Sequence, residues 1–116
     1  MKTVLILDRS PCVRFYHKLL LSRAGYATVV AADRDEAAAV LRNQAVDLLM
    51  LEPATQEPGV GALLQETGVV NGVPLLVVST EAQRLGGALP AKTPGELLQK
   101  PVLPDALLSA VRRLIG

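Results

Sequence analysis

The 116-residue chain has the length of one domain that can bury a hydrophobic core. Half of its residues are hydrophobic and its formal net charge is only +1, so there is no bulk electrostatic attraction for nucleic acid. No apolar stretch reaches the roughly 20 residues of a membrane-spanning helix, and no signal peptide precedes the first apolar run. The single cysteine cannot form an internal disulfide and favours a reducing cytoplasm. We therefore expect a cytoplasmic protein that binds neither nucleic acid nor membranes.

Short apolar runs bounded by turn signals predict buried parallel strands. There are five of them, at residues 3–7, 26–31, 46–51, 73–78 and 96–99. Helical patterns lie between and after them, at residues 12–24, 34–43, 61–67 and 104–115. Prolines at 11 and 104 suit the first turn of a helix, and Gly25 suits a helix C-terminus. Asp33 and Glu36 form a variant capping box at the start of the second helix.

Strands and helices alternate along residues 1–116, and this order predicts a single α/β domain. The expected fold is a flavodoxin-like (βα)5 three-layer sandwich with a five-stranded parallel sheet and right-handed crossovers. The stretch 81–95 departs from the pattern because it contains three glycines and two prolines, which destabilise helix interiors. We expect the fourth helix to be shortened or irregular there, as a surface loop or as a remodelled surface for a partner.

Four polar residues stand where a predicted strand ends: Asp8, Glu52, Ser79 and Lys100. In a parallel sheet the carboxyl ends of the strands share one edge, where ligands bind. Two carboxylates, a hydroxyl and an amine are therefore expected to converge on one small site.

The segments around these residues read LILDRSPCVR, VDLLMLEP, PLLVVST and Lys100-Pro101. In this order the chain resembles the CheY-like receiver domains of bacterial response regulators over its full length. In that family, an acid pair after the first strand and an Asp after the third hold Mg2+, and a histidine kinase phosphorylates the latter Asp. The resemblance assigns Asp8 to the first acid and Glu52 to the phosphoacceptor position. It assigns Ser79 and Lys100 to the groups that bind phosphoryl oxygens.

The chain departs from this pattern at three of the family's functional positions. Arg9 replaces the second acid, Glu52 replaces the acceptor Asp, and Leu97 stands where an aromatic switch residue is common. Asp8 and Glu52 supply a charge of −2, whereas Arg9 and Lys100 supply +2. A neutralised pocket attracts Mg2+ weakly, and Arg9 is expected to bridge to one of the carboxylates.

We therefore predict a degenerate acidic pocket at Asp8, Arg9 and Glu52, with no bound metal, no cofactor and no catalytic residues. Without the metal, phosphoryl transfer loses its charge stabilisation. The predicted protein is a non-enzymatic pseudo-receiver that acts in signalling by binding another protein. Two alternatives stay open: a response regulator with residual phosphorylation, and a purely structural or oligomerisation module.

The first and last helices each have more apolar residues than one buried face needs. Helical spacing predicts an inward set of Val13, Tyr16, Leu20 and Ala24 in the first helix and of Leu107, Val111 and Leu114 in the last. This assignment leaves four apolar residues outside those sets, namely Phe15, Leu19, Leu103 and Leu108. Because the two helices are neighbours in this fold, these residues predict an interface for a protein partner, or for a second copy of the chain.

Overall fold

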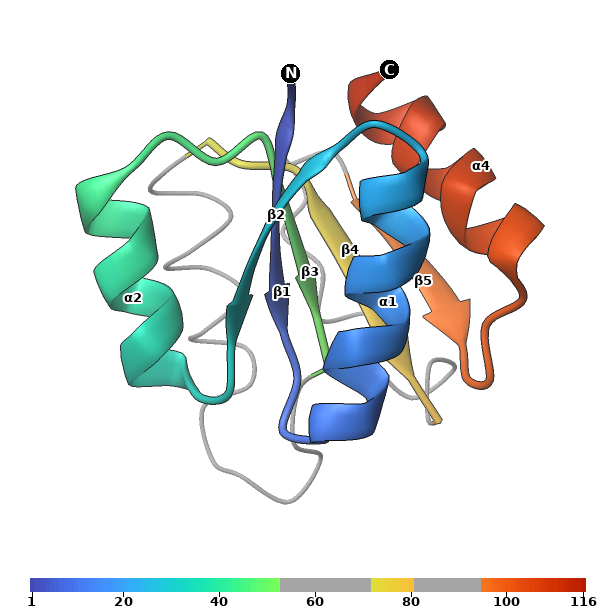
Figure 1. The fold of residues 1–116 in the computed structure, drawn as a ribbon, viewed down its shortest axis with the longest axis horizontal. Coiled ribbons are helices and arrows are strands. Elements are labelled where there is room, and N and C mark those ends of the chain that lie inside the picture. The colour runs from blue at the N-terminus through green and yellow to red at the C-terminus, as the bar shows by residue number, and fades with distance from the viewer. Residues whose placement is uncertain (53–71, 81–94) are drawn as a thin grey trace.

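The computed structural model describes residues 1–52, 72–80 and 95–116, and these form a parallel sheet covered by helices on both faces (Figure 1). The strands are β1 (Thr3–Leu7), β2 (Ala27–Ala31), β3 (Leu48–Leu51), β4 (Leu75–Ser79) and β5 (Gly95–Gln99). The helices are α1 (Pro11–Arg23), α2 (Arg34–Asn43) and α4 (Pro104–Ile115). The strand order β2-β1-β3-β4-β5 is the flavodoxin-like order, as the sequence predicts.

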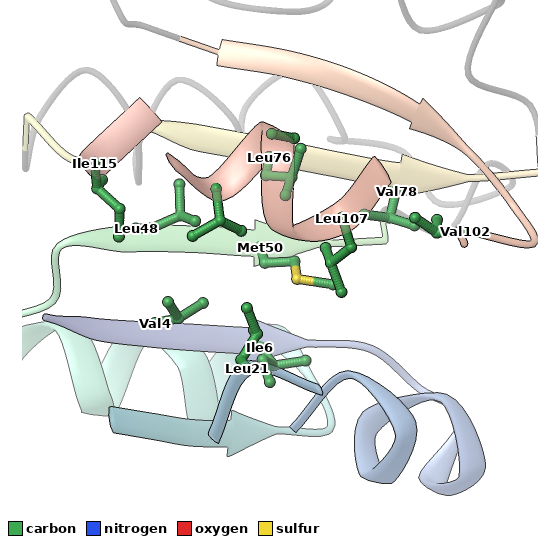
Figure 2. Close-up of a cluster of buried hydrophobic side chains, with 12 residues drawn as sticks. Val4, Ile6, Leu21, Leu48, Met50, Leu76, Val78, Val102, Leu107 and Ile115 are labelled. Atoms are coloured by element: carbon green, nitrogen blue, oxygen red, sulfur yellow. The ribbon is translucent and has the colours of Figure 1, made fainter. Parts of the chain in front are cut away.

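Side chains alternate between the two faces of the sheet and so build two cores. The first core lies under α1 and α4; its sheet residues are Val4, Ile6, Leu48, Met50, Leu76 and Val78 (Figure 2). The second lies under α2; its sheet residues are Leu5, Leu7, Ala31, Leu49, Leu51, Leu75 and Val77. Because both faces are covered, these strands are apolar at nearly every position instead of at every second one.

The helices α1 and α2 begin with side-chain caps, and the sequence predicts the cap of α2. Ser10 is the N-cap of α1, and its side chain accepts a hydrogen bond from the backbone N–H of Val13. At α2 the Asp33 carboxylate accepts from the N–H of Glu36, at 2.9 Å. The Glu36 carboxylate reaches back to the N–H of Ala32, at 2.7 Å, one residue earlier than in the usual capping box.

The predicted inward face of α1 is right only in part: Leu20 is half-buried and packs against the first core, and Val13 is half-buried. His17 and Leu21 are the buried residues of this helix, whereas Tyr16 is 39% exposed and Ala24 is exposed. Helix α1 carries apolar residues on most of its sides, so several of its faces fit a helical period. The face that packs on the sheet is the one with His17 and Leu21, which lie one turn apart. In α4 the prediction is confirmed for Leu107 and Val111; Leu114 is partly buried, and Ala110 and Ile115 complete the buried face.

Two further predictions fall on parts of the chain that are not described, namely the helix at 61–67 and all but the last residue of the irregular segment at 81–95; that last residue, Gly95, begins β5. The observed strands differ from the predicted ones by up to two residues at their ends, which is the usual uncertainty of such boundaries. Among the helices of the described ranges, none combines the length and the apolar character needed to span a membrane.

Candidate functional site

The sheet itself positions three of the candidate residues. Each follows the last residue of a strand and extends the ladder through its backbone N–H. The hydrogen bonds run from Asp8 to the Ala31 carbonyl at 3.2 Å, from Glu52 to Leu7 at 2.9 Å, and from Lys100 to Ser79 at 3.0 Å. The backbones are therefore fixed at the carboxyl edge of the sheet, and the side chains meet there.

Lys100 joins the two carboxylates at this edge. Its ammonium donates to Asp8 Oδ2 at 2.9 Å and forms an ion pair with Glu52 Oε2. The second oxygen of Asp8 accepts from the backbone N–H of Ser10, at 2.9 Å. Asp8 is only 3% exposed, so its carboxylate depends on these two donors to replace water.

The charges of this cluster decide the protonation of Lys100. Burial alone lowers the pKa of this lysine, but the hydrogen bonds and charges of Glu52 and Asp8 outweigh burial, and its pKa is raised above the ordinary value. Lys100 therefore stays charged, and the three side chains together carry a net charge of −1. Lys100 is a cation that contacts both carboxylates, and Arg9, the residue after Asp8, is exposed.

The other sequence-predicted positions lie next to this cluster. Ser79, the last residue of β4, is 1% exposed, and its main-chain carbonyl accepts a hydrogen bond from the backbone N–H of Lys100. Leu97 in β5 pairs in register with Val77 and packs, half-buried, against the core under α2. The peptide bond from Lys100 to Pro101 is cis.

Two residues near the cluster are absent from the sequence-based predictions. Arg14 donates through Nη1 to the main-chain carbonyl of Asp8, at 2.6 Å, and so fixes the turn from β1 into α1. His17 is 3% exposed and borders a narrow gap shared with Asp8 and Glu52. Its spacing of four residues from both Val13 and Leu21 was the available signal for a buried position.

The environment of His17 keeps its imidazole neutral. Burial, and after it the charge of Lys100, lowers the pKa of His17 from 6.5 to about 4, while the charge of Asp8 opposes the change. The Nδ1 atom is buried and has no hydrogen-bond partner among the described residues. An uncharged imidazole, whose Nδ1 has no partner in the described ranges, thus lies next to a charged cluster.

The apolar residues predicted as an interface fall into two groups. Phe15, Leu19 and Leu103 are 67%, 37% and 72% exposed. Leu108 is half-buried and packs against the core under α1 and α4, so it does not belong with the exposed three.

The donor set fits Mg2+ poorly. Mg2+ requires near-octahedral oxygen coordination, usually from carboxylates and water. Here both carboxylates already hold the same ammonium, and Ser10 takes the other oxygen of Asp8. Within residues 1–52, 72–80 and 95–116, no three acidic, histidine or cysteine side chains are grouped so that they could hold a metal.

No known sequence family and no curated protein matches this chain. Solved structures do match: the chemotaxis protein CheY4 of Vibrio cholerae has 27% identity and a TM-score of 0.78 over 98% of each chain. A two-component response regulator from Clostridium difficile has 22% identity and a TM-score of 0.86, over 98% of this chain and 95% of that one. The Thermotoga maritima response regulator TrrA, solved with Mg2+ and BeF, has 22% identity and a TM-score of 0.79 over 98% and 99%. This chain therefore has the fold of the CheY-like response-regulator receiver domains, which are its structural neighbours over nearly its whole length.

Proposed function

We propose that this chain is a pseudo-receiver: a signalling module of the two-component type that binds another protein and does not accept a phosphoryl group. The observation that supports this most is the shared ammonium, because Asp8 and Glu52 both pair with Lys100. With Arg9 beside Asp8, the four charged groups sum to zero. The attraction that would draw a divalent cation to this edge is then weak, because Lys100 alone reduces the charge of the two carboxylates to −1 and Arg9 adds a further positive charge nearby in the sequence.

The geometry of Glu52 points in the same direction. In-line phosphoryl transfer depends on a nucleophile held in place and on a metal that neutralises the developing charge. Glu52 carries its carboxylate one methylene further out than Asp, and this arm reaches Lys100. In our proposal the pair is a permanent contact that replaces the contact between the lysine and a phosphorylated acceptor.

The proposed binding surface comprises Phe15 and Leu19 of α1 and Leu103 at the start of α4. Side chains as exposed as Phe15 and Leu103 leave much apolar area in water, and such patches often mark interaction sites. We propose a protein partner in the cytoplasm for this surface, with a second copy of the chain as the competing occupant.

Thermal unfolding with Mg2+ and beryllofluoride tests the loss of phosphoryl chemistry. We expect the melting temperature of the natural chain to stay unchanged, since a ligand at 100 times its Kd would stabilise by about 2.7 kcal/mol if it bound. The double variant R9D/E52D restores both acids and is expected to gain a response. TrrA, solved with Mg2+ and BeF, serves as the positive control for the reagents. A clear rise in the melting temperature of the natural chain would show that the proposal is wrong.

A further inference from the structure

Strand β2 is an edge of the sheet that lacks the usual protection against pairing. It comes first in the strand order, so within the described ranges it has a neighbouring strand, β1, on one side only. Natural edge strands usually carry a charge, a proline or a bulge, each of which keeps another strand from adding. The sequence of β2 is Ala-Thr-Val-Val-Ala, and its register on β1 runs without interruption from 27 to 31. None of these three devices is therefore present in β2.

The strand at the other end of the order is built differently. Strand β5 contains Glu96, which forms an ion pair with Arg113 at 2.7 Å. Lys100 and Pro101 follow directly after this strand. Charge and proline at such positions disfavour the addition of a further strand. Of these two strands, β2 is the one that remains suited to pairing.

The main chain of β2 turns a row of polar groups away from the sheet. At its two ends the strand bonds to β1, through the N–H of Ala27 at 2.9 Å and the carbonyl of Ala31 at 3.2 Å. In a parallel ladder alternate residues direct both main-chain groups to the same side. Thr28 and Val30, at the even positions between these ends, therefore direct two N–H and two carbonyl groups outward. A partner that satisfies such a row in register is another extended strand.

The side chains of β2 also favour a strand as the partner. Val30 is 39% exposed, whereas Thr28 and Val29 are half-buried. All three are β-branched, and residues of this type pack well against each other across neighbouring strands. An added strand would cover Val30 and pair the outward groups in the same step.

The charges at the two ends of β2 favour a second copy of this chain in the antiparallel direction. Arg23 lies before the strand, and no acid stands between the two. After the strand come Asp33, Arg34, Asp35 and Glu36, three acids and one arginine with a net charge of −2; all of these side chains are exposed. In an antiparallel pair each end lies beside the opposite end of the other copy, so unlike charges meet. A parallel pair would place like charges together.

From these observations we propose that two copies of the chain associate through β2, antiparallel, about a two-fold axis at Val29. Thr28 of one copy then lies opposite Val30 of the other, and this register pairs all the outward main-chain groups. The two sheets join into one continuous sheet. The contact uses neither the charged cluster nor the surface at Phe15 and Leu103, so it can fail without the proposed function, and the proposed function can fail without it.

Site-directed cross-linking tests the register, in chains that also carry Cys12→Ser because Cys12 is exposed. Val29→Cys places two thiols directly opposite each other in a non-hydrogen-bonded pair, where Cα atoms lie about 4.5 Å apart, within the range of a disulfide. Ala27→Cys lies on the same face of the strand, but its two thiols are on the order of 13 Å apart along the strands. With oxidised glutathione we expect at least tenfold more linked dimer from Val29→Cys than from Ala27→Cys.

Sedimentation equilibrium of the whole 116-residue chain tests the association itself. We expect a dimer that forms as the concentration rises. Val30→Lys places a charge on the open edge and is expected to raise the dissociation constant at least tenfold. Leu103→Lys adds the same charge at another exposed apolar residue, 72% exposed, and should leave the constant unchanged. Circular dichroism confirms that both variants are folded.

Three results would overturn the proposal. A natural chain that stays monomeric at about 1 mM would refute the association. Equal effects of Val30→Lys and Leu103→Lys, or a loss of the dimer in Leu103→Lys alone, would refute β2 as the contact. Equal cross-linking of Val29→Cys and Ala27→Cys would refute the antiparallel register about Val29.

Discussion

Acidification is expected to destabilise the fold through His17, the one histidine in the chain. The unfolded chain takes up this proton near pH 6.5, whereas the folded protein resists until about pH 4. Between these values the unfolded state binds more protons, so the free energy of unfolding falls as the pH falls. Above about pH 7.5 the imidazole is almost entirely neutral in both states and has no such effect.

The size of this effect follows from the two pKa values. A tenfold difference in proton affinity is worth about 1.4 kcal/mol. A folded-state pKa of about 4 in place of 6.5 therefore limits the loss to roughly 3 kcal/mol. Between about pH 7.5 and about pH 4.5, most of this loss, roughly 2.5 kcal/mol, is expected. Because small domains are only about 5–15 kcal/mol stable, the change is large.

Urea unfolding followed by circular dichroism at several pH values measures the effect. His17→Leu and His17→Gln remove the titrating group, so the difference between the natural chain and each variant isolates the histidine from the carboxylates. We expect both differences to change by the same amount over this range. Curves that run parallel for the natural chain and both variants would refute the reasoning. A histidine NMR signal that titrates near pH 6.5 in the folded protein would refute it as well.

Four further outcomes are expected from other parts of the molecule. Lys100→Ala leaves the carboxylates of Asp8 and Glu52 without their shared cation and is expected to lower the free energy of unfolding by about 1–3 kcal/mol. Addition of Glu52→Gln should recover part of this loss. A strictly additive double-mutant cycle would contradict the contact. Leu107→Ala removes a side chain that is fully buried in the core under α4 and should cost about 2–5 kcal/mol in urea unfolding. Tyr16→Phe removes the bond to the Val102 carbonyl and should cost about 1 kcal/mol, with amide shifts confined to α1 and the loop before α4; unaltered stability and spectra would show that the bond does not form. Phe15→Ser with Leu103→Ser should leave stability nearly unchanged, because both side chains are exposed, while weakening capture of a protein partner or self-association in analytical ultracentrifugation.

The sheet and the position of its charged edge could be predicted because they depend on patterns along the chain. Apolar runs that end in Asp8, Glu52 and Lys100 give both the strands and the edge on which the polar residues meet. The polarity of the sheet then determines that residues 92 positions apart are neighbours.

The orientation of α1 could not be predicted in the same way. Its apolar residues point in most directions, so periodicity alone does not select an inward face. His17 is not part of the predicted inward set, and histidine is in general only partly buried, so its residue type gives no signal for burial. That it lies next to the charged cluster depends on how α1 sits on the sheet, and this depends on side chains from β1, β3 and α4.

The ion pairs of Lys100 with Asp8 and Glu52 also bear on how the protein folds during its synthesis. Translation delivers β1 and its buried acid early, but the lysine that neutralises this acid emerges only when most of the chain has been made. Contacts that close such long loops form late and slowly. A nascent chain that ends before residue 100 holds two acids at the sheet edge without their shared cation. The last segment thus supplies a whole edge strand, a core helix and the missing charge in one step, and we expect cooperative folding to wait for it.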